Sequence, residues 1–255
     1  MTLIVRPGFQ FDTDASTYIE AVEVADAQAL ETATRYAIND FVIGCKQDGT
    51  WSAIKASCIL AGARTTNGAL VPLVGTAPTP SNFDLVSNTD YNRKTGLLGN
   101  GSTKYLNTNR AENADPQNSV HTSVYITSVF SSAQYILFGS DNSSSCGLYR
   151  ALSNVNTYSR NATAGTSVAS STGFAGASRP TSASFVGRVF GTQTTTALAS
   201  VTSNTTNFFV FGAAGSSSNR GSGRLAFYSI GESLDLALLD ARVSALITAF
   251  GVAIP

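Results

Sequence analysis

The chain has 255 residues, a formal net charge of zero and only 13% charged residues. Nucleic-acid binding by counterion release requires a basic face, and this composition offers none, so we expect no nucleic-acid partner. The length suits one large β domain, or one such domain with a small attachment. After Lys104, the last lysine, Ser, Thr, Asn and Gly predominate, as they do on β-sheet surfaces and in tight loops.

The first part of the chain has a helical pattern. Thr17 and Glu20 have the spacing of a capping box. Apolar residues recur at intervals of three and four over residues 27–46, which predicts an amphipathic helix there. The same spacing over 51–58 predicts a second, shorter helical element. Residues 1–11 are apolar but too few to form a core alone, so we expect them to be buried against a neighbour or added to a sheet edge.

A break follows near residue 78. The stretch 75–81 contains Pro78 and Pro80, which fix φ and remove backbone donors, so neither a helix nor a strand continues through it. We therefore expect a helical N-terminal attachment segment over 1–75 and a β domain over 76–255.

Beyond residue 104 the pattern is one of short strands separated by turns. Alternation over 120–126 and apolar runs over 135–138, 184–190 and 207–211 predict strands, with Ser-rich and Gly-rich loops between them. Strands at this spacing indicate a mainly β fold, an antiparallel sandwich.

The chain ends in a predicted helix. Its apolar stripe has helical spacing, Ser233 can cap its start and Gly251 can end it. The stripe consists of Leu236, Leu239, Val243, Leu246 and Phe250. One amphipathic helix at the end of a sandwich is expected to cover a sheet edge or an end of the core.

The sequence indicates no secretory leader and no membrane span. Residues 1–25 lack a cationic start followed by an apolar run. We find no stretch of about 18 apolar residues. The three cysteines, Cys45, Cys58 and Cys146, are too few and too scattered for a disulfide scaffold, and we expect buried free thiols.

No catalytic motif stands out. Jelly-roll glycosidases place paired carboxylates on one strand, and this sequence has no such cluster. Glu112 and Asp115 lie in a polar stretch, and Glu232 and Asp235 flank the last helix, where acids favour the helix dipole. His121, the only histidine, lies in an alternating strand, so we expect a strand-surface or half-buried side chain rather than a catalytic base.

Ligand sites are less defined. Asp141 and Asn142 are the best local candidates for binding calcium, but one acid is a poor ligand set, and an ordinary turn is the competing interpretation. We expect no other metal or cofactor. Tyr125, Tyr149 and Tyr158 could stack on sugars or pack against other strands, and the sequence does not choose between these roles.

Several segments resemble a known family. Residues 99–106 are similar to the opening strand of a laminin-G-like (concanavalin A-like) jelly roll, and residues 223–231 with the helix after them are similar to its closing strand and final helix. Four other segments resemble the leader of structural proteins of tailed bacteriophages, in which a leader precedes such a jelly roll; these are residues 37–46, 51–56, 68–73 and 91–97. The resemblance covers most of the chain.

The resemblance implies a non-enzymatic structural protein of a tailed-phage virion, assembled in the host cytoplasm. Its jelly roll would serve as a tail appendage or fibre component that contacts the host surface. The alternatives are a capsid decoration protein, such as a cement or head-fibre protein that stabilises the shell, and a free glycan-binding lectin or glycosidase. The implied partners are other tail or capsid proteins, further copies of this chain in a homo-oligomer, and a host surface glycan.

Overall fold

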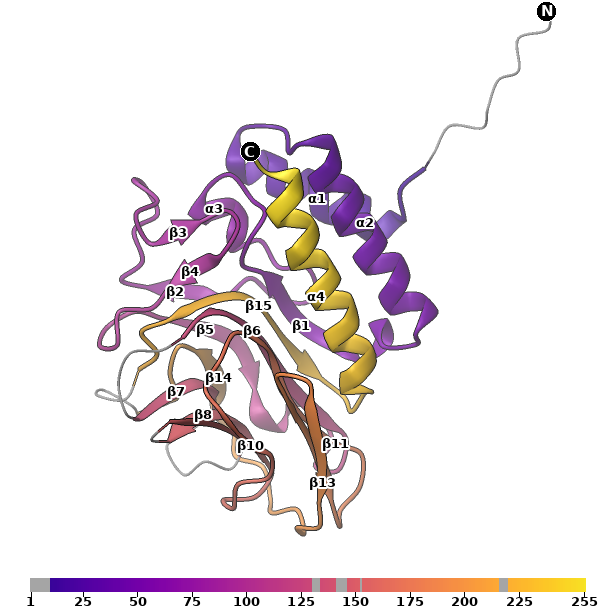
Figure 1. The fold of residues 1–255 in the computed structure, drawn as a ribbon, viewed down its shortest axis with the longest axis vertical. Coiled ribbons are helices and arrows are strands. Elements are labelled where there is room, and N and C mark those ends of the chain that lie inside the picture. The colour runs from indigo at the N-terminus through magenta and orange to yellow at the C-terminus, as the bar shows by residue number, and fades with distance from the viewer. Residues whose placement is uncertain (1–9, 130–133, 141–145, 152, 216–219) are drawn as a thin grey trace, which may run out of the picture.

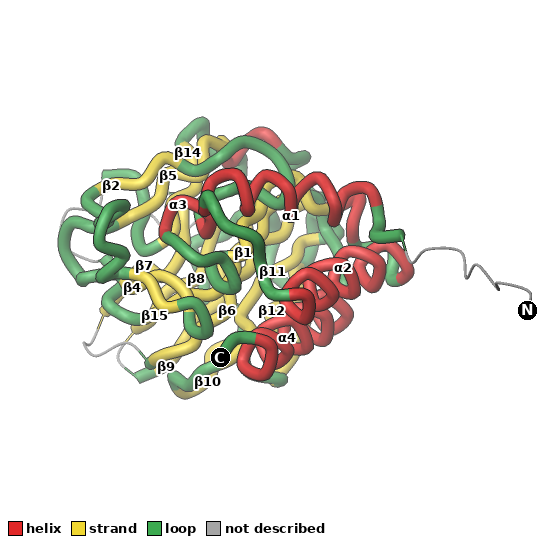
Figure 2. The backbone as a smooth tube through the Cα atoms, turned by 90° about the horizontal axis from the view of Figure 1, so that it is seen from above, coloured by secondary structure: helices red, strands yellow, loops and turns green. Residues whose placement is uncertain are grey.

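The computed structural model describes residues 10–129, 134–140, 146–151, 153–215 and 220–255. Two antiparallel sheets pack face to face, and the three long helices gather on one side of this sandwich (Figure 1). The view from above in Figure 2 shows the same helical layer. This architecture confirms the predicted mainly β sandwich with an N-terminal helical segment and a C-terminal helix.

Sheet A faces the helices. Its strands are β1 (Ile54–Ile59), β3 (Tyr91–Asn92), β4 (Gly96–Leu98), β6 (Val120–Ser128), β11 (Gly173–Arg179), β12 (Phe185–Val189), β13 (Thr192–Thr196) and β15 (Arg224–Gly231). Their order is β13-β12-β11-β6-β15-β4-β3. Strands β4 and β1 share one edge of β15, because β4 pairs with residues 224–225 and β1 with residues 227–231.

Sheet B forms the other half of the sandwich. Its strands are β2 (Thr79–Ser81), β5 (Tyr105–Ala111), β7 (Gln134–Gly139), β8 (Cys146–Ala151), β9 (Asn154–Ser159), β10 (Ser167–Ala169) and β14 (Asn207–Val210). Their order is β10-β9-β8-β7-β14-β5-β2. The predicted opening strand over 99–106 begins later, at Tyr105, because the Asn100 side chain accepts backbone hydrogen bonds from residues 102, 103 and 104 and holds that stretch in a turn.

The N-terminal helices differ from the prediction. The predicted helix over 27–46 is α2 (Thr32–Gln47), and a separate helix, α1 (Thr13–Asp26), precedes it. The Asp12 side chain caps α1 by accepting a hydrogen bond from the backbone N–H of Asp14. The pair Thr17 and Glu20 therefore lies inside α1 and not at a helix start. Ala27 adopts a left-handed conformation, with φ of 50°, and ends α1.

The second predicted helix, over 51–58, is wrong. Trp51–Ala53 forms one 3-10 turn, η1, and Ile54–Ile59 is strand β1, paired with β15. The apolar spacing of this stretch fits both periods over so short a length, and pairing with a buried central strand decides the outcome. Two further short elements are helix α3 (Thr66–Ala69) and the 3-10 turn η2 (Glu112–Ala114).

The last helix, α4, spans Leu236–Ala253. Asp235 caps it by accepting from two backbone N–H groups, whereas the predicted cap, Ser233, bonds to Ser119. Gly251, the predicted stop, lies inside the helix. Among the described residues α4 is the one helix long and apolar enough to cross a membrane. Its predicted stripe is buried against α2 and sheet A, which is the packing of a core helix.

The core continues from the sheets into the helical layer. Phe227 and Tyr228 are neighbours on β15 and point to opposite faces. Phe227 meets Phe41 of α2, with ring centroids 5.8 Å apart, whereas Tyr228 meets Phe138 of sheet B at 6.3 Å. One hydrophobic cluster thus extends from Ala15 to Ile254. That residues 1–75 and residues 76–255 are separate folding units stays a prediction.

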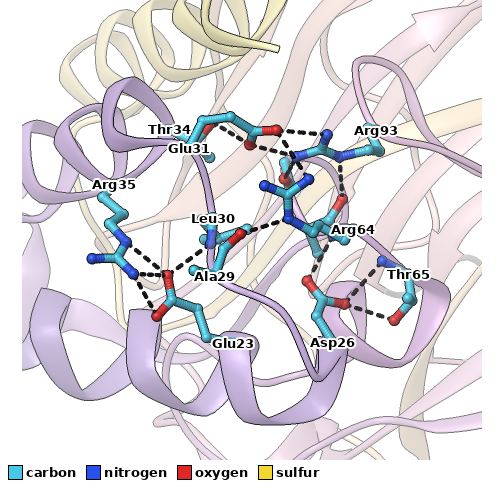
Figure 3. A network of polar contacts seen from close by, with 12 residues as sticks. Glu23, Asp26, Ala29, Leu30, Glu31, Thr34, Arg35, Arg64, Thr65 and Arg93 are labelled. Atoms are coloured by element: carbon cyan, nitrogen blue, oxygen red, sulfur yellow. Dashed lines mark hydrogen bonds and ion pairs between the residues drawn. The ribbon is translucent and has the colours of Figure 1, made fainter. Parts of the chain in front are cut away.

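A polar network also joins the helices to the sandwich (Figure 3). Two nitrogens of Arg93 donate to the carboxylate of Glu31 at 2.9 and 2.6 Å, and Arg64 pairs with the same carboxylate at 3.2 Å. Asp26, at the end of α1, accepts hydrogen bonds from the backbone N–H groups of Arg64 and Thr65 at 2.6 and 2.9 Å. These contacts fix the turn between α1 and α2 against the strands.

Candidate functional site

The structure places the residues that sequence analysis singled out in different parts of the fold. Asp141 and Asn142 lie outside the described residues, so calcium binding there stays a prediction. Within the part of the chain that the structure describes, no group of three or more His, Cys, Asp or Glu side chains is arranged to hold a metal ion.

Two of the acids weighed as catalytic candidates are buried in ion pairs. Glu112 is fully buried, and one of its oxygens accepts from Arg160 at 2.9 Å while the other accepts from Ser140 at 2.5 Å. Asp115 accepts from Arg110 at 2.9 Å and is 3% exposed. A carboxylate enclosed in such a pair has no access to a substrate, and removal of its arginine partner would leave an uncompensated buried charge.

The other two acids flank α4 as expected. Asp235 caps the helix, and Glu232 pairs with Lys55 of β1 at 3.0 Å. Both side chains support the junction between sheet A and the last helix.

His121 contacts a serine, but both are enclosed. Its Nε2 lies 2.7 Å from the Ser229 hydroxyl, its Nδ1 lies 2.6 Å from the Glu232 carbonyl, and both His121 and Ser229 are fully buried. The expectation of a surface or half-buried histidine was wrong, because the end of β15 and the segment that leads from it to α4 pack against the ring. Burial lowers the pKa of His121 to about 4, so the ring is neutral at pH 7 and serves as a hydrogen-bonding core residue.

The three cysteines are buried free thiols, as predicted. Burial raises the pKa of each thiol to about 12, so none is a thiolate at neutral pH.

The three tyrosines divide into two groups. Tyr125 of β6 is opposite Phe227 in the ladder and packs against the main core, on the helix side of sheet A. Tyr149 and Tyr158 lie on the outer face of sheet B, in edge-to-face contact with centroids 5.1 Å apart. Ala213 packs against both. The structure therefore keeps Tyr149 and Tyr158 together on sheet B and places Tyr125 apart from them, on the helix side of sheet A.

The outer face of sheet B carries further aromatic side chains. Phe209 of β14 is opposite Asn107 on one side and Gly139 on the other. Gly139 is opposite Gly147, and Gly147 is opposite Tyr158. These five residues form one transverse row across β5, β14, β7, β8 and β9, and residues in register project to the same face. Their strand neighbours that face inward are fully buried; these include Leu106, Phe208, Val210, Leu148 and Val155.

One end of this row has an aromatic and cationic cluster. The Tyr105 ring lies 5.6 Å from Phe209, and the Arg220 guanidinium lies 4.0 Å over Tyr105. Asn207 donates to Asn107 at 3.0 Å on the same face. Tyr105, Phe209 and Tyr158 are each half-buried, whereas Tyr149 is buried, with 8% of its surface exposed. We call this surface, from Tyr105 and Arg220 across Phe209 to Tyr149 and Tyr158, the aromatic face.

The aromatic face combines aromatic rings with the side-chain amides of Asn107 and Asn207 and with the guanidinium of Arg220, whose Nε and Nη1 are buried. Such a combination is suited to a ligand with an apolar face and hydroxyl groups at its edges, as in a sugar ring. Sequence analysis named Tyr149 and Tyr158 but missed Tyr105, Phe209 and Arg220. The sequence did contain a signal for Phe209. Phe208 and Phe209 are adjacent in a predicted strand, and adjacent strand residues face opposite sides of a sheet, so one of the two rings must face away from the core.

No protein-family model matches the sequence, and no curated protein sequence is similar to it. Similarity is found among solved structures. Trypanosoma rangeli sialidase in complex with sialic acid has a TM-score of 0.51 with 10% sequence identity, over 77% of this chain and 33% of the sialidase chain. The point mutant W1238A of HCR/D has a TM-score of 0.46 with 12% identity, over 76% of this chain and 50% of that one.

This similarity concerns the fold alone, because the sequence identity is so low. The chain spans about a third of the length of the sialidase, so the superposition includes only a part of that protein. What the comparison establishes is that the two sheets form a β-sandwich with known structural counterparts.

Proposed function

We propose that the protein is a non-enzymatic structural component of a tailed-phage virion, and that it displays the aromatic face as a tail appendage that binds a host surface glycan. The register row from Asn107 through Phe209 to Tyr158 is the observation that carries this proposal. The low fraction of charged residues, 13% of the chain, and the sequence resemblance to phage structural proteins support the virion role. The buried states of His121 and Glu112 support a binding role without catalysis.

Glycan binding is tested with the purified chain on an array of bacterial surface polysaccharides. For the glycan bound best, Phe209→Ala and Tyr158→Ala should each raise Kd about tenfold or more, which corresponds to about 1.4 kcal/mol or more of lost contact. Tyr36→Ala is the matched control, because Tyr36 is 40% exposed on α2, at the opposite side of the sandwich. Unchanged affinity in both face variants, with melting temperatures retained, would reject the aromatic face.

The virion role is tested separately by antibody labelling of purified particles. Label on the tail is the expected result. Label on the shell would instead establish the capsid decoration role, and particles without the protein would reject both. Release of free sugar from any bound polysaccharide would contradict the non-enzymatic part of the proposal.

A further inference from the structure

The two sheets end in four edge strands, and these edges are not alike. In the described part of the chain, sheet A ends in β13 and β3, and sheet B ends in β10 and β2. Strand β3 has two residues, β10 has three, and β2 has three that include Pro80. Very short edge strands and prolines are features by which proteins prevent a sheet from pairing with another chain. Three of these four edges are therefore protected.

Strand β13 has neither feature. It has five residues, and it pairs with β12 in a register that has no bulge. Its sequence, Thr-Gln-Thr-Thr-Thr, contains no charge and no proline, and residues 192–195 are exposed. After Thr196 the chain runs toward sheet B, where the N–H of Val201 donates to the carbonyl of Arg160, next to β9. Among the described residues, the outer edge of β13 is thus regular, uncharged and uncovered.

The turn before β13 sets which of its backbone groups face outward. Phe190 and Gly191 join β12 to β13, and both have positive φ, 48° and 82°. These values fit a two-residue type I′ hairpin, in which the residues that flank the turn exchange both of their backbone hydrogen bonds. Val189 and Thr192 are that pair. The N–H of Phe190 donates to the Phe174 carbonyl of β11, on the other side of β12, as this alternation requires.

Hydrogen bonding then alternates along β13. Thr192, Thr194 and Thr196 bond to β12, so the N–H and C=O groups of Gln193 and Thr195 point away from sheet A. These outward groups have no hydrogen-bond partner within the described part of the chain. A regular strand that presents unpaired backbone groups is a template for another strand.

We propose that β13 pairs antiparallel with β13 of a second copy of this chain, about a two-fold axis at Thr194, so that sheet A continues from one copy into the other. Gln193 then lies opposite Thr195 of the second copy, and Thr195 lies opposite Gln193 of the second copy. This register pairs every outward N–H with an outward C=O. The strand carries no charge, so the two copies meet without the cost of like charges placed opposite each other.

A second copy is the partner that this edge fits, because pairing about Thr194 is symmetric and closes with two copies. The pairing uses an edge of sheet A, whereas the aromatic face lies on sheet B, so the inference is independent of the proposed function. Residues 1–9, for which the sequence predicts burial against a neighbour or addition to a sheet edge, lie outside the described residues and have no part in it.

Single cysteines test the register in the full chain. Thr192 and Thr194 are both exposed on the same face of β13. Across the two-fold axis Thr194 lies opposite itself in a non-hydrogen-bonded pair, with Cα atoms about 4.5 Å apart, which a disulfide can bridge. Thr192 lies opposite Thr196 of the second copy, so its own counterpart is four residues away, at about 14 Å.

Under mild oxidation, Thr194→Cys should therefore form a disulfide between two chains at least about ten times faster than Thr192→Cys. The native thiols interfere little, because burial raises the pKa of Cys45, Cys58 and Cys146 to about 12. Equal rates at the two positions would overturn the proposal, because they would indicate random collision and no preferred register.

Sedimentation equilibrium measures the association without cysteine. One strand pair makes a small interface, so we expect a dimer with Kd in the micromolar range, populated at about 100 μM protein. Thr195→Pro removes an outward N–H and leaves the bonds to β12 in place, so it should give a monomer. Thr195→Val is the matched control, because it keeps the backbone groups and the branched shape and should keep the dimer.

A second variant covers the case in which proline disturbs the fold. Gln193→Lys combined with Thr195→Lys keeps every backbone group but sets lysines opposite lysines across the axis, and it should also give a monomer with an unchanged melting temperature. A monomeric original protein at about 100 μM would overturn the proposal and leave the edge to a strand of another protein. A dimer that persists in the lysine variant would also overturn it, because the contact would then lie elsewhere.

Discussion

Arg93 and Glu31, 62 residues apart in the chain, form a two-point ion pair with N–O distances of 2.9 and 2.6 Å. Glu31 is the N-cap residue that immediately precedes α2, and Arg93 lies in the turn between β3 and β4. The same guanidinium donates to the backbone carbonyls of Gly62 and Ala63. One side chain therefore holds the helical layer, the segment after β1 and a hairpin of sheet A in a fixed arrangement (Figure 3).

Glu31→Gln should lower the free energy of unfolding at pH 7 by about 1–3 kcal/mol, because the charge-assisted hydrogen bonds to Arg93 are lost. Hydrogen bonding to Arg93 lowers the pKa of Glu31 from 4.5 to about 2. A carboxyl group with a lowered folded-state pKa stabilises the protein above its unfolded pKa, and this stabilisation is lost as the pH falls from about 4.5 toward 2. Chemical denaturation of the original protein and of Glu31→Gln should show that the difference between their unfolding free energies shrinks as the pH falls through this range. A difference that stays constant would contradict the role assigned to the Glu31–Arg93 pair.

Leu239→Ala and Leu238→Ala form a matched pair on α4. Leu239 is fully buried, whereas Leu238 is 39% exposed. Removal of a buried leucine side chain leaves a cavity and typically costs about 2–5 kcal/mol, so Leu239→Ala should lower the melting temperature clearly. Leu238→Ala should change it much less, since surface substitutions usually stay within about 0.5 kcal/mol. Equal effects would mean that the stripe of α4 does not pack as the structure shows.

His121 should make the protein less stable in mild acid. Burial lowers its folded-state pKa to about 4 from 6.5, so the unfolded chain binds more protons between these values. Stability should therefore fall as the pH drops from 6.5 toward 4, by up to about 3 kcal/mol, and level off below. His121→Asn keeps a donor for the Glu232 carbonyl but cannot titrate. The unfolding free energy of this variant should change less between pH 6.5 and 4 than that of the original protein. An equally steep pH dependence in the variant would assign the acid sensitivity to other groups.

The sequence pattern predicted much of the sandwich because alternation and turns are local signals. Strands β6, β12, β14 and β15 lie close to their predicted positions. The patterns failed where distant contacts decide the local structure. Ile54–Ile59 becomes a strand through pairing with β15, some 170 residues later. His121 is buried where β6 meets the end of β15, and its ring nitrogens contact the Ser229 hydroxyl and the Glu232 carbonyl, more than 100 residues later in the chain.

The candidate site was only partly predictable for the same reason. Tyr149 and Tyr158 are visible in the sequence as strand aromatics, but their contact depends on the register of β8 with β9. Phe209 joins them through the register of β14 with β7 and of β7 with β8. Register across four strands follows from turn lengths and packing together, and no single stretch of sequence contains it.

Deletion of residues 1–75 tests whether the helical segment is a separate folding unit, as the sequence predicted. The deletion removes α1, α2 and β1. It leaves residues 227–231 of β15 without a ladder partner on one edge, and it exposes Phe227 and the inner side of α4. An unpaired central strand beside exposed apolar surface promotes aggregation. We therefore expect the fragment 76–255 to be insoluble or to unfold without cooperativity.

The shorter deletion of residues 1–9 is the control and should stay folded, because it removes no described strand or helix. A soluble 76–255 fragment with a sharp thermal transition would instead establish the boundary near Pro78 and make the helical layer a detachable attachment segment.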